Sequence, residues 1–238
     1  AITTGTSLEL TITAYDIGDN VVTGYSGLKS LTFSGLANSP DGNIPTVEGV
    51  NLSGPVPVTF AIGVSAVGGA TLIATKVESA SLDVSDGTNT SNASASYDLD
   101  LTVTVGNATK LKFTTLPPAS VNAGVVWSSF GAGIFDLYGN PRISAGDTNT
   151  ITITEDGPGT FSGTVSKPAV TGTATFNDIS YPQVGGINVT ASSMGLTSTP
   201  PSAVTINPGT VSYLKLTAPS SAITTGTSLE LTITAYDI

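Results

Sequence analysis

Apolar and polar residues alternate along much of this chain, which is the pattern of β-strands that bury one face. In residues 7–14 (SLELTITA), Leu, Ile and Ala alternate with Ser, Glu and Thr, and the same alternation recurs in residues 101–105 and 151–154. A period of two places successive side chains on opposite faces of a strand. No segment carries the 3.6-residue apolar stripe with capping residues that predicts a helix. The pattern therefore predicts an all-β protein.

Clusters of Gly, Pro, Asp and Asn separate these strands and mark turns. They occur at residues 18–20, 39–42, 86–87, 156–159 and 185–186. Gly tolerates positive φ, Pro fixes φ, and Asp and Asn bond to their own backbone, so these residues favour turns. About seven short strands in each stretch of about 100–120 residues predict an immunoglobulin-like β-sandwich. A barrel is the alternative, but the termini of a sandwich leave at opposite ends, which suits a tandem array better.

The two ends of the chain are identical in sequence. Residues 1–17 and 222–238 both read AITTGTSLELTITAYDI, and the spacing between Ala1 and Ala222 gives a repeat period of 221 residues. Chance does not produce such an identity, and repeated units build quasi-one-dimensional structures. We therefore predict a tandem array in a fibre, stalk or sheath. Because the chain has neither an initiator Met nor a signal peptide, we expect it to be an interior part of something longer.

A weaker repeat lies within this period. Tyr213–Thr217 (YLKLT) resembles Lys110–Thr114 (KLKFT), and residues 14–20 (AYDIGDN) resemble residues 134–140 (IFDLYGN). Later matches follow in the same order and pair residues 58–60 with 174–176 and residues 67–69 with 184–186. The shared order predicts two homologous modules in each period, both of about 100–120 residues.

These matches set the predicted domain boundaries. Residues 106–208 form one complete immunoglobulin-like sandwich. Residues 1–105 form a second sandwich that lacks its own first strand, since the equivalent of that strand is Ser212–Ala218. Residues 209–238 are then the first strands of the next repeat.

Three segments of residues 106–208 resemble a known family. Gly106–Thr115 (GNATKLKFTT), Phe135–Asn140 (FDLYGN) and Gly172–Ile179 (GTATFNDI) are similar to the bacterial immunoglobulin-like (Big-type) tandem repeat of giant surface proteins, adhesins and fibres. The resemblance extends more loosely to residues 1–105. It implies a prokaryotic β-sandwich that serves as a spacer in extracellular or cell-surface stalks, with no catalytic residues to carry over. The chain departs from the family pattern in the identity of its repeated ends.

Composition removes several classes of function. The chain has no Cys and no His, which excludes Ser-His-Asp and Cys-His catalysis and zinc sites with thiolate or imidazole ligands. Its net charge of -10 and only 7 Lys and Arg residues argue against a nucleic-acid partner. No apolar stretch approaches the roughly 20 residues of a membrane span. A disulfide-free exposed protein suits a prokaryotic surface.

Paired carboxylates remain the one catalytic possibility, because two of them can hydrolyse a glycoside. Glu155 and Asp156 precede a Gly-Pro-Gly turn and suit the polar end of a hairpin. Asp98 and Asp100 lie two residues apart, and so face the same side of a strand. We therefore predict that the protein is not an enzyme.

Calcium is the one cofactor that the sequence suggests. Asp16, Asp19 and Asn20 lie close together, and Asp136 and Asn140 repeat the arrangement in the second module. Carboxylate and amide oxygens are the ligands that calcium prefers. The alternative is that these side chains cap the backbone of their own turns.

Two further groups of residues are candidate surface sites. Five Asn-x-Ser/Thr sequons could carry glycans, at Asn51, Asn89, Asn92, Asn107 and Asn188. Tyr213, Leu214 and Leu216 are candidates for contacts between repeats, because they belong to the strand that residues 1–105 lack. Trp127 is a fourth candidate, since strand parity with Phe130 places it on the outer face. A bulge would return Trp127 to the core.

The predicted function is that of a structural repeat unit of an extracellular filament, sheath or stalk whose partners are copies of itself. Charged residues make up 10% of the chain, against about 25% in ordinary domains, so little opposes association. Copies would be joined in one covalent array, or one subunit would donate a strand to its neighbour. The alternative is an adhesin module that binds a glycan or host protein through end loops such as Leu36–Pro57.

Overall fold

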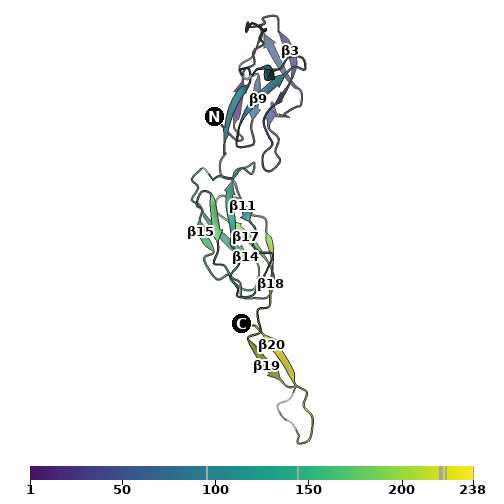
Figure 1. The fold of residues 1–238 in the computed structure, drawn as a ribbon, viewed down its shortest axis with the longest axis vertical. Helices are drawn as coiled ribbons and strands as arrows, with labels where there is room; N and C mark the ends of the chain where they lie inside the picture. Colours follow the sequence, from purple (N-terminus) through teal and green to yellow (C-terminus); the bar gives the residue numbers. More distant parts are fainter. Residues whose placement is uncertain (95, 144, 220–221, 223, 238) are drawn as a thin grey trace. The chain divides into compact units, whose positions relative to one another are not determined.

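The computed structural model describes residues 1–94, 96–143, 145–219, 222 and 224–237, and these residues form an all-β protein (Figure 1). They divide into two compact units. The first unit consists of residues 1–110 with 134–145, and the second consists of residues 111–133 with 146–238. Over the described residues, no helix has the length and hydrophobicity needed to cross a membrane.

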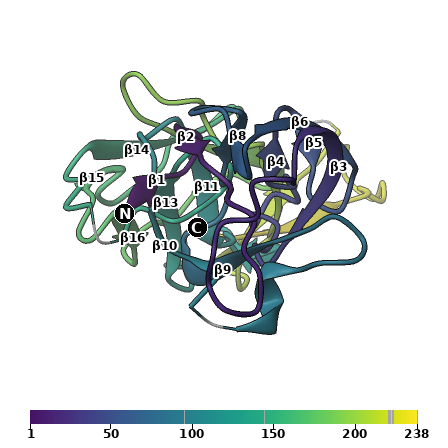
Figure 2. The same cartoon turned by 90° about the horizontal axis from the view of Figure 1, so that it is seen from above.

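The first unit is a sandwich of two sheets. One has the order β1-β10-β9-β3-β6-β7, with bounds Ile2–Thr3, Leu99–Thr104, Glu78–Ser85, Gly27–Ser34, Val56–Ala61 and Val64–Ser65. The other has the order β2-β8-β4-β5, with bounds Ser7–Leu10, Ala70–Ile73, Thr46–Val47 and Val50–Asn51. Figure 2 shows β4 and β5 near β8. A short 3-10 turn, η1 (Ser91–Ala93), follows β9.

The second unit also holds two facing sheets. The three-stranded sheet has the order β11-β13-β16, with bounds Lys110–Thr115, Phe130–Phe135 and Thr173–Phe176. The five-stranded sheet has the order β12-β18-β17-β14-β15, with bounds Ser120–Asn122, Ser202–Asn207, Gly185–Ser192, Thr150–Glu155 and Ser166–Pro168. An added two-stranded hairpin consists of β19 (Tyr213–Thr217) and β20 (Thr232–Tyr236).

The strand order confirms the predicted immunoglobulin-like class. In each sandwich a short early strand runs parallel to the last strand, β1 beside β10 and β12 beside β18, while the other ladders are antiparallel. Two sheets packed face to face with such connections are the immunoglobulin arrangement. One difference separates the two sandwiches: β11 precedes β12 in the second, whereas the described part of residues 1–105 contains no strand equivalent to β11.

The alternation read from the sequence places the core. In β6, Val56, Val58 and Phe60 are buried while the residues between them are exposed. The cores otherwise consist mainly of aliphatic and aromatic residues, including Phe33, Leu72, Leu82 and Val103 in the first unit and Trp127, Phe130, Ile153, Phe176 and Val189 in the second. Because each strand buries alternate side chains, the sequence period determines which face lies inside.

Trp127 corrects one prediction. It is 3% exposed and packs edge-on against Phe161, with 5.3 Å between ring centroids, so it is a core residue and not an outer-face anchor. Strand parity fails because β13 begins only at Phe130, and the backbone N–H of Trp127 donates to the carbonyl of Ile179. The alternative of core packing, which the sequence left open, is the correct one.

Candidate inter-repeat surface

An aspartate closes the same turn in two parts of the chain. Oδ1 of Asp16 accepts hydrogen bonds from the backbone N–H groups two and four residues later, each at 2.9 Å. Oδ1 of Asp136 accepts the equivalent bonds at 3.0 and 2.8 Å. In each turn the Asn four residues later, Asn20 or Asn140, also donates its side-chain amide to that carboxylate. The structure thus repeats the internal match found in the sequence.

The two turns differ in their surroundings. Asp136 and Asn140 are each 1% exposed and lie within the first unit. Oδ2 of Asp136 accepts hydrogen bonds from Oγ1 of Thr4 at 2.7 Å and from the N–H of Gly106 at 3.3 Å. Asp16 accepts hydrogen bonds only from its own turn among the described residues, and it is exposed.

Asn140 completes the buried version of the turn. Its Nδ2 donates to the carbonyl of Thr75 at 2.8 Å, and its Oδ1 accepts the N–H of Val77 at 3.0 Å. Every polar atom of this side chain is therefore paired, as buried amides require. Asn20, the equivalent residue in the first turn, is exposed.

One hydrogen bond of this arrangement recurs near the end of the chain. Since residues 222–238 repeat residues 1–17, Asp237 is the copy of Asp16. The N–H of Gly209 donates to Oδ2 of Asp237 at 2.6 Å, which is the same bond that Gly106 makes with Asp136. The N–H of Ser212 donates to the carbonyl of Tyr236 at 2.7 Å.

That last bond also has an equivalent earlier in the chain. The N–H of Thr109, which lies three residues after Gly106, donates at 2.9 Å to the carbonyl of Phe135, which is the residue before Asp136. The bonds that Gly209 and Ser212 make to Asp237 and Tyr236 therefore match those that Gly106 and Thr109 make to Asp136 and Phe135.

The hairpin β19–β20 carries an exposed apolar face. Leu214 pairs with Ala235 and Leu216 pairs with Ile233, so these side chains share one face. Leu214, Leu216 and Ile233 are 67%, 62% and 66% exposed. In β11 the residue that matches Leu214 is Leu111, which is 1% exposed.

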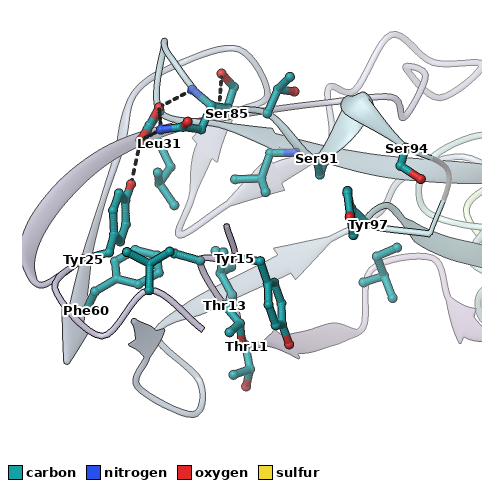
Figure 3. Close-up of a pocket in the computed structure, with 18 of the residues that line it drawn as sticks. Thr11, Thr13, Tyr15, Tyr25, Leu31, Phe60, Ser85, Ser91, Ser94 and Tyr97 are labelled. Carbon is teal, nitrogen blue, oxygen red and sulfur yellow. Dashed lines mark hydrogen bonds between the residues drawn. The ribbon is translucent and has the colours of Figure 1, made fainter. Parts of the chain in front are cut away.

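The first unit has an open groove where the second has a strand. Residues 11–15, which follow β2, line one edge of a groove of about 960 Å³ in the first unit. Core residues lie at its base, among them Leu31, Phe33, Phe60 and Leu82. Figure 3 shows Thr11, Thr13 and Tyr15 one after another along this edge.

The edge of the groove has unpaired backbone. Ile12 and Ala14 bond to residues 63–65 on one side, because the N–H of Ala14 donates to the carbonyl of Gly63 and the carbonyl of Ile12 accepts the N–H of Ser65. The backbone groups of Thr13 and Tyr15 therefore point to the other side, and among the described residues they make no hydrogen bond. The sequence predicted one strand over residues 7–14, but the structure ends β2 at Leu10.

Burial of the equivalent residues supports the comparison. Ile12 and Ala14 are half-buried, whereas Ala132 and Ile134, at the matching positions of β13, are 0% and 1% exposed. A position that is sealed in one sandwich is thus partly open to solvent in the other.

The end of the groove is held by a tyrosine–aspartate hydrogen bond. The hydroxyl of Tyr25 donates to Oδ2 of Asp86 at 2.8 Å, and the Tyr25 ring packs edge-on against Phe60 (Figure 3). Burial, together with this bond and the Asp86 charge, raises the pKa of Tyr25 to about 12. The backbone N–H groups of Asn89 and Thr88 lower the pKa of Asp86. No sequence pattern singled out Tyr25.

The predicted calcium residues are placed as turn caps. Asp16 and Asp136 accept their own backbone N–H groups, and hydrogen bonds from the N–H groups of Asn20 and Gly18 lower the pKa of Asp16. Asp19 points elsewhere and accepts the hydroxyl of Tyr97 at 2.7 Å. Over the described residues, no group of three or more acidic side chains gathers. The geometry matches the capping alternative, and calcium binding stays a prediction.

Three of the four carboxylates considered for catalysis accept hydrogen bonds within the fold. Glu155 accepts the N–H of Gly157, and Asp156 accepts both the N–H and the side-chain amide of Asn188. Asp100 accepts the hydroxyl of Ser81 at 2.6 Å.

One carboxyl pair escaped the sequence argument. Asp83 on β9 meets Asp98, just before β10, and burial together with the hydrogen bond to Asp98 raises the pKa of Asp83. The residues are 15 positions apart in sequence and meet only because β9 and β10 are antiparallel neighbours. No sequence spacing rule links them.

The sequons and the remaining contact residues lie at the surface. All five sequon side chains, Asn51, Asn89, Asn92, Asn107 and Asn188, are exposed. The amides of Asn89 and Asn188 bond to Asp86 and Asp156. Glycosylation stays a prediction. Tyr213 is 54% exposed and stacks on Tyr236 with 5.2 Å between ring centroids.

Comparisons with known proteins add solved structures of similar fold. No family model matches the chain, and no curated protein matches it. FdeC, an Escherichia coli adhesin, is 18% identical, with 99% of this chain and 70% of that chain covered and a TM-score of 0.40. InvD of Yersinia pseudotuberculosis is 19% identical, with 97% and 65% covered and a TM-score of 0.34.

A third similar structure is a β-glycosidase from Bacteroides vulgatus, which is 14% identical and has a TM-score of 0.37. That match covers 74% of this chain and 25% of the glycosidase chain. Identities and scores this low carry nothing about function. The immunoglobulin-like class rests on the strand order described above.

Proposed function

We propose that this chain is a structural repeat unit of an extracellular filament, sheath or stalk whose copies join end to end. The observation that carries the proposal is the tail of residues 209–237. Its strand β20 has the sequence of residues 11–15, and its bonds from Gly209 and Ser212 repeat those of Gly106 and Thr109. The chain thus contains the start of a junction of the kind that joins one copy to the next.

The partner in this proposal is another copy of the chain. The exposed hairpin face and the open groove are both apolar, which favours burial on association. Extracellular location rests on the resemblance of residues 106–208 to bacterial immunoglobulin-like surface repeats. No catalytic, metal or nucleic-acid chemistry is needed for this function.

The denatured mass of the native assembly tests the proposal. A species far above the 23.7 kDa of this chain would mean that copies form one covalent array. A band near 23.7 kDa, from material that is polymeric before denaturation, would mean separate subunits that associate. Native material that stays monomeric at high concentration and has the mass of one copy would overturn the proposal.

The alternative of an adhesin module has less support. The sequence offered Leu36–Pro57 as a binding loop, but Thr46–Val47 and Val50–Asn51 form strands β4 and β5, and Val47 is 0% exposed. Residues 46–47, 50–51 and 56–57 of this segment therefore belong to sheets. Binding to a glycan or host-protein array by a monomeric chain, with no self-association, would favour the adhesin function instead.

A further inference from the structure

We propose that the groove of the first unit is the binding site for strand β19 of another copy of this chain. The inference rests on the proposed function, because it identifies the contact through which copies join. The chain contains a segment that fits the groove. Strand β19 pairs with β20, and β20 has the same sequence as residues 11–15, which form the edge of the groove.

The register follows from the hairpin. Leu214 pairs with Ala235 and Leu216 pairs with Ile233, and these partners are the copies of Ala14 and Ile12. Directly opposed residues in a ladder share a face. Since Ile12 and Ala14 line the groove, the bound strand places both leucines over the core.

The second sandwich shows the filled arrangement. There β11 lies beside β13, Leu111 is 1% exposed, and the Phe113 ring lies 6.4 Å from that of Phe130. Leu111 and Phe113 match Leu214 and Leu216 in sequence. The groove of the first unit is the same position, without a strand in it among the described residues.

The exchange has a clear driving force. When β19 separates from β20 and pairs with residues 11–15 of another copy, it pairs with the same five-residue sequence. The backbone hydrogen bonds lost in the hairpin are therefore replaced by equivalent ones. The net change is the burial of Leu214 and Leu216, which are 67% and 62% exposed in the hairpin. Strand addition also pairs the free backbone groups of Thr13 and Tyr15.

The Asp16 turn gains a partner in the same step. Asp237 accepts the N–H of Gly209 four residues before β19, so a donated β19 brings Gly209 to Asp16. Asp16 then has the additional bond that Asp136 makes with Gly106. One donated segment therefore completes both the strand edge and the turn.

A register-specific disulfide tests the proposal, because the chain contains no Cys. Lys215 pairs with Thr234, the copy of Thr13, so the double substitution Thr13→Cys with Lys215→Cys places the two thiols opposite each other in neighbouring chains. The matched control is Thr11→Cys with Lys215→Cys, in which the thiols are offset by two residues, about 7 Å along the strand.

We expect oxidation to give disulfide-linked dimers and longer ladders at least tenfold more abundant in the first variant than in the control. Non-reducing denaturing gels give the yields, and sedimentation velocity of the reduced chains gives the extent of assembly. Chains that assemble with equal yields from both variants would overturn the β19 contact and leave the proposed function intact.

A labelled peptide of residues 209–219 tests the groove without chain assembly. Added to the full chain, the peptide should bind, and its Leu214→Asn variant should bind at least tenfold more weakly, while Thr217→Asn, on the outer face, should change affinity less than twofold. In a chain that carries Thr13→Pro, which blocks the free edge, binding should be lost while the circular dichroism spectrum stays unchanged.

The peptide result separates the two proposals. Face-specific peptide binding by a chain that never assembles would support the groove assignment and contradict end-to-end joining. If the peptide did not bind, or if Leu214→Asn and Thr217→Asn lowered its affinity equally, the groove assignment would be overturned.

Discussion

The carboxylates of Asp16 and Asp136 close the same turn, yet only Asp136 is buried among further donors. Removing Asp136 leaves the N–H of Gly106 and the hydroxyl of Thr4 without their acceptor. An unpaired buried polar group costs about 1–3 kcal/mol, whereas an exposed one is solvated by water. The same substitution should therefore have different effects at the two positions.

We expect Asp136→Ala to lower the free energy of unfolding by about 2–4 kcal/mol, and Asp16→Ala to change it far less. Urea denaturation of both variants measures the difference. Equal losses would mean that the bonds from Thr4 and Gly106 to Asp136 contribute little. In assembled material Asp16→Ala should weaken association, because Asp16 then has a partner.

Asp83 gives the stability a pH dependence of its own. Burial and the hydrogen bond to Asp98 raise the pKa of Asp83 in the folded chain. Its contribution to folding stability is therefore fully present below the pKa of the unfolded chain and is lost as pH rises through the raised pKa of the folded chain. We expect Asp83→Asn, which cannot ionise, to be more stable than the parent chain at pH about 7, with the difference vanishing near pH about 3. Thermal unfolding across this pH range provides the measurement.

Asp178 is the matched control of opposite sign. Hydrogen bonds from Thr164 and Lys167 lower its pKa to about 2, so its contribution is present above the unfolded value and is lost as pH falls towards about 2. Asp178→Asn should therefore be less stable than the parent chain at neutral pH. If Asp83→Asn and Asp178→Asn both raised or both lowered the stability at neutral pH, the opposite pKa shifts of the two carboxyls would be contradicted.

At the scale of elements, β11 and β19 are the same strand in two settings. We expect Leu111→Ala to cost about 2–5 kcal/mol because it leaves a cavity in a packed core. Leu214→Ala, at the matching exposed position, should change the stability of the isolated chain by less than about 0.5 kcal/mol. Urea titrations of the two variants check this. A large loss from Leu214→Ala in monomeric chain would mean that the hairpin face already has a partner.

The element comparison also shows where sequence periodicity failed. Residues 7–14 alternate without a break, and the sequence predicts one strand, but β2 stops at Leu10. Alternation reports which side chains face a core, whereas a regular strand also needs a partner for its backbone. Residues 12–14 have such a partner on only one side, at residues 63–65.

At the scale of the whole molecule, charge opposes assembly. Each chain carries a net charge of -10, so copies repel one another at low ionic strength. We expect the association constant to rise at least about threefold between about 20 and about 200 mM NaCl, as screening increases. Sedimentation equilibrium measures it. Association that weakens with salt would point to ion pairs as the main contact, in place of the apolar groove.

Calcium provides a separate whole-molecule test. If the Asp16 and Asp136 turns act only as backbone caps, calcium and magnesium at the same ionic strength should give the same thermal stability and the same assembly, and EDTA should change neither. A calcium-specific increase in melting temperature that EDTA reverses would assign an ion to these residues.

Sequence by itself determined the strand faces, the turn positions and the repeat. These features are local or are read by comparing one segment with another: alternation gives the core face of β6, and the match of residues 14–20 with 134–140 predicts a shared turn. The absence of Cys and His excludes catalysis and metal binding by thiolate or imidazole groups. None of these inferences requires knowing which strands are neighbours.

Only the tertiary structure decided what depends on neighbours. It buried Trp127, brought Asp83 to Asp98, and gave Asp136 the partners that Asp16 lacks. It also showed that residues 11–15 border a groove. The reason is physical: burial and hydrogen bonding depend on what packs across the sheet, and two identical sequences, residues 11–15 and β20, have different partners in one chain.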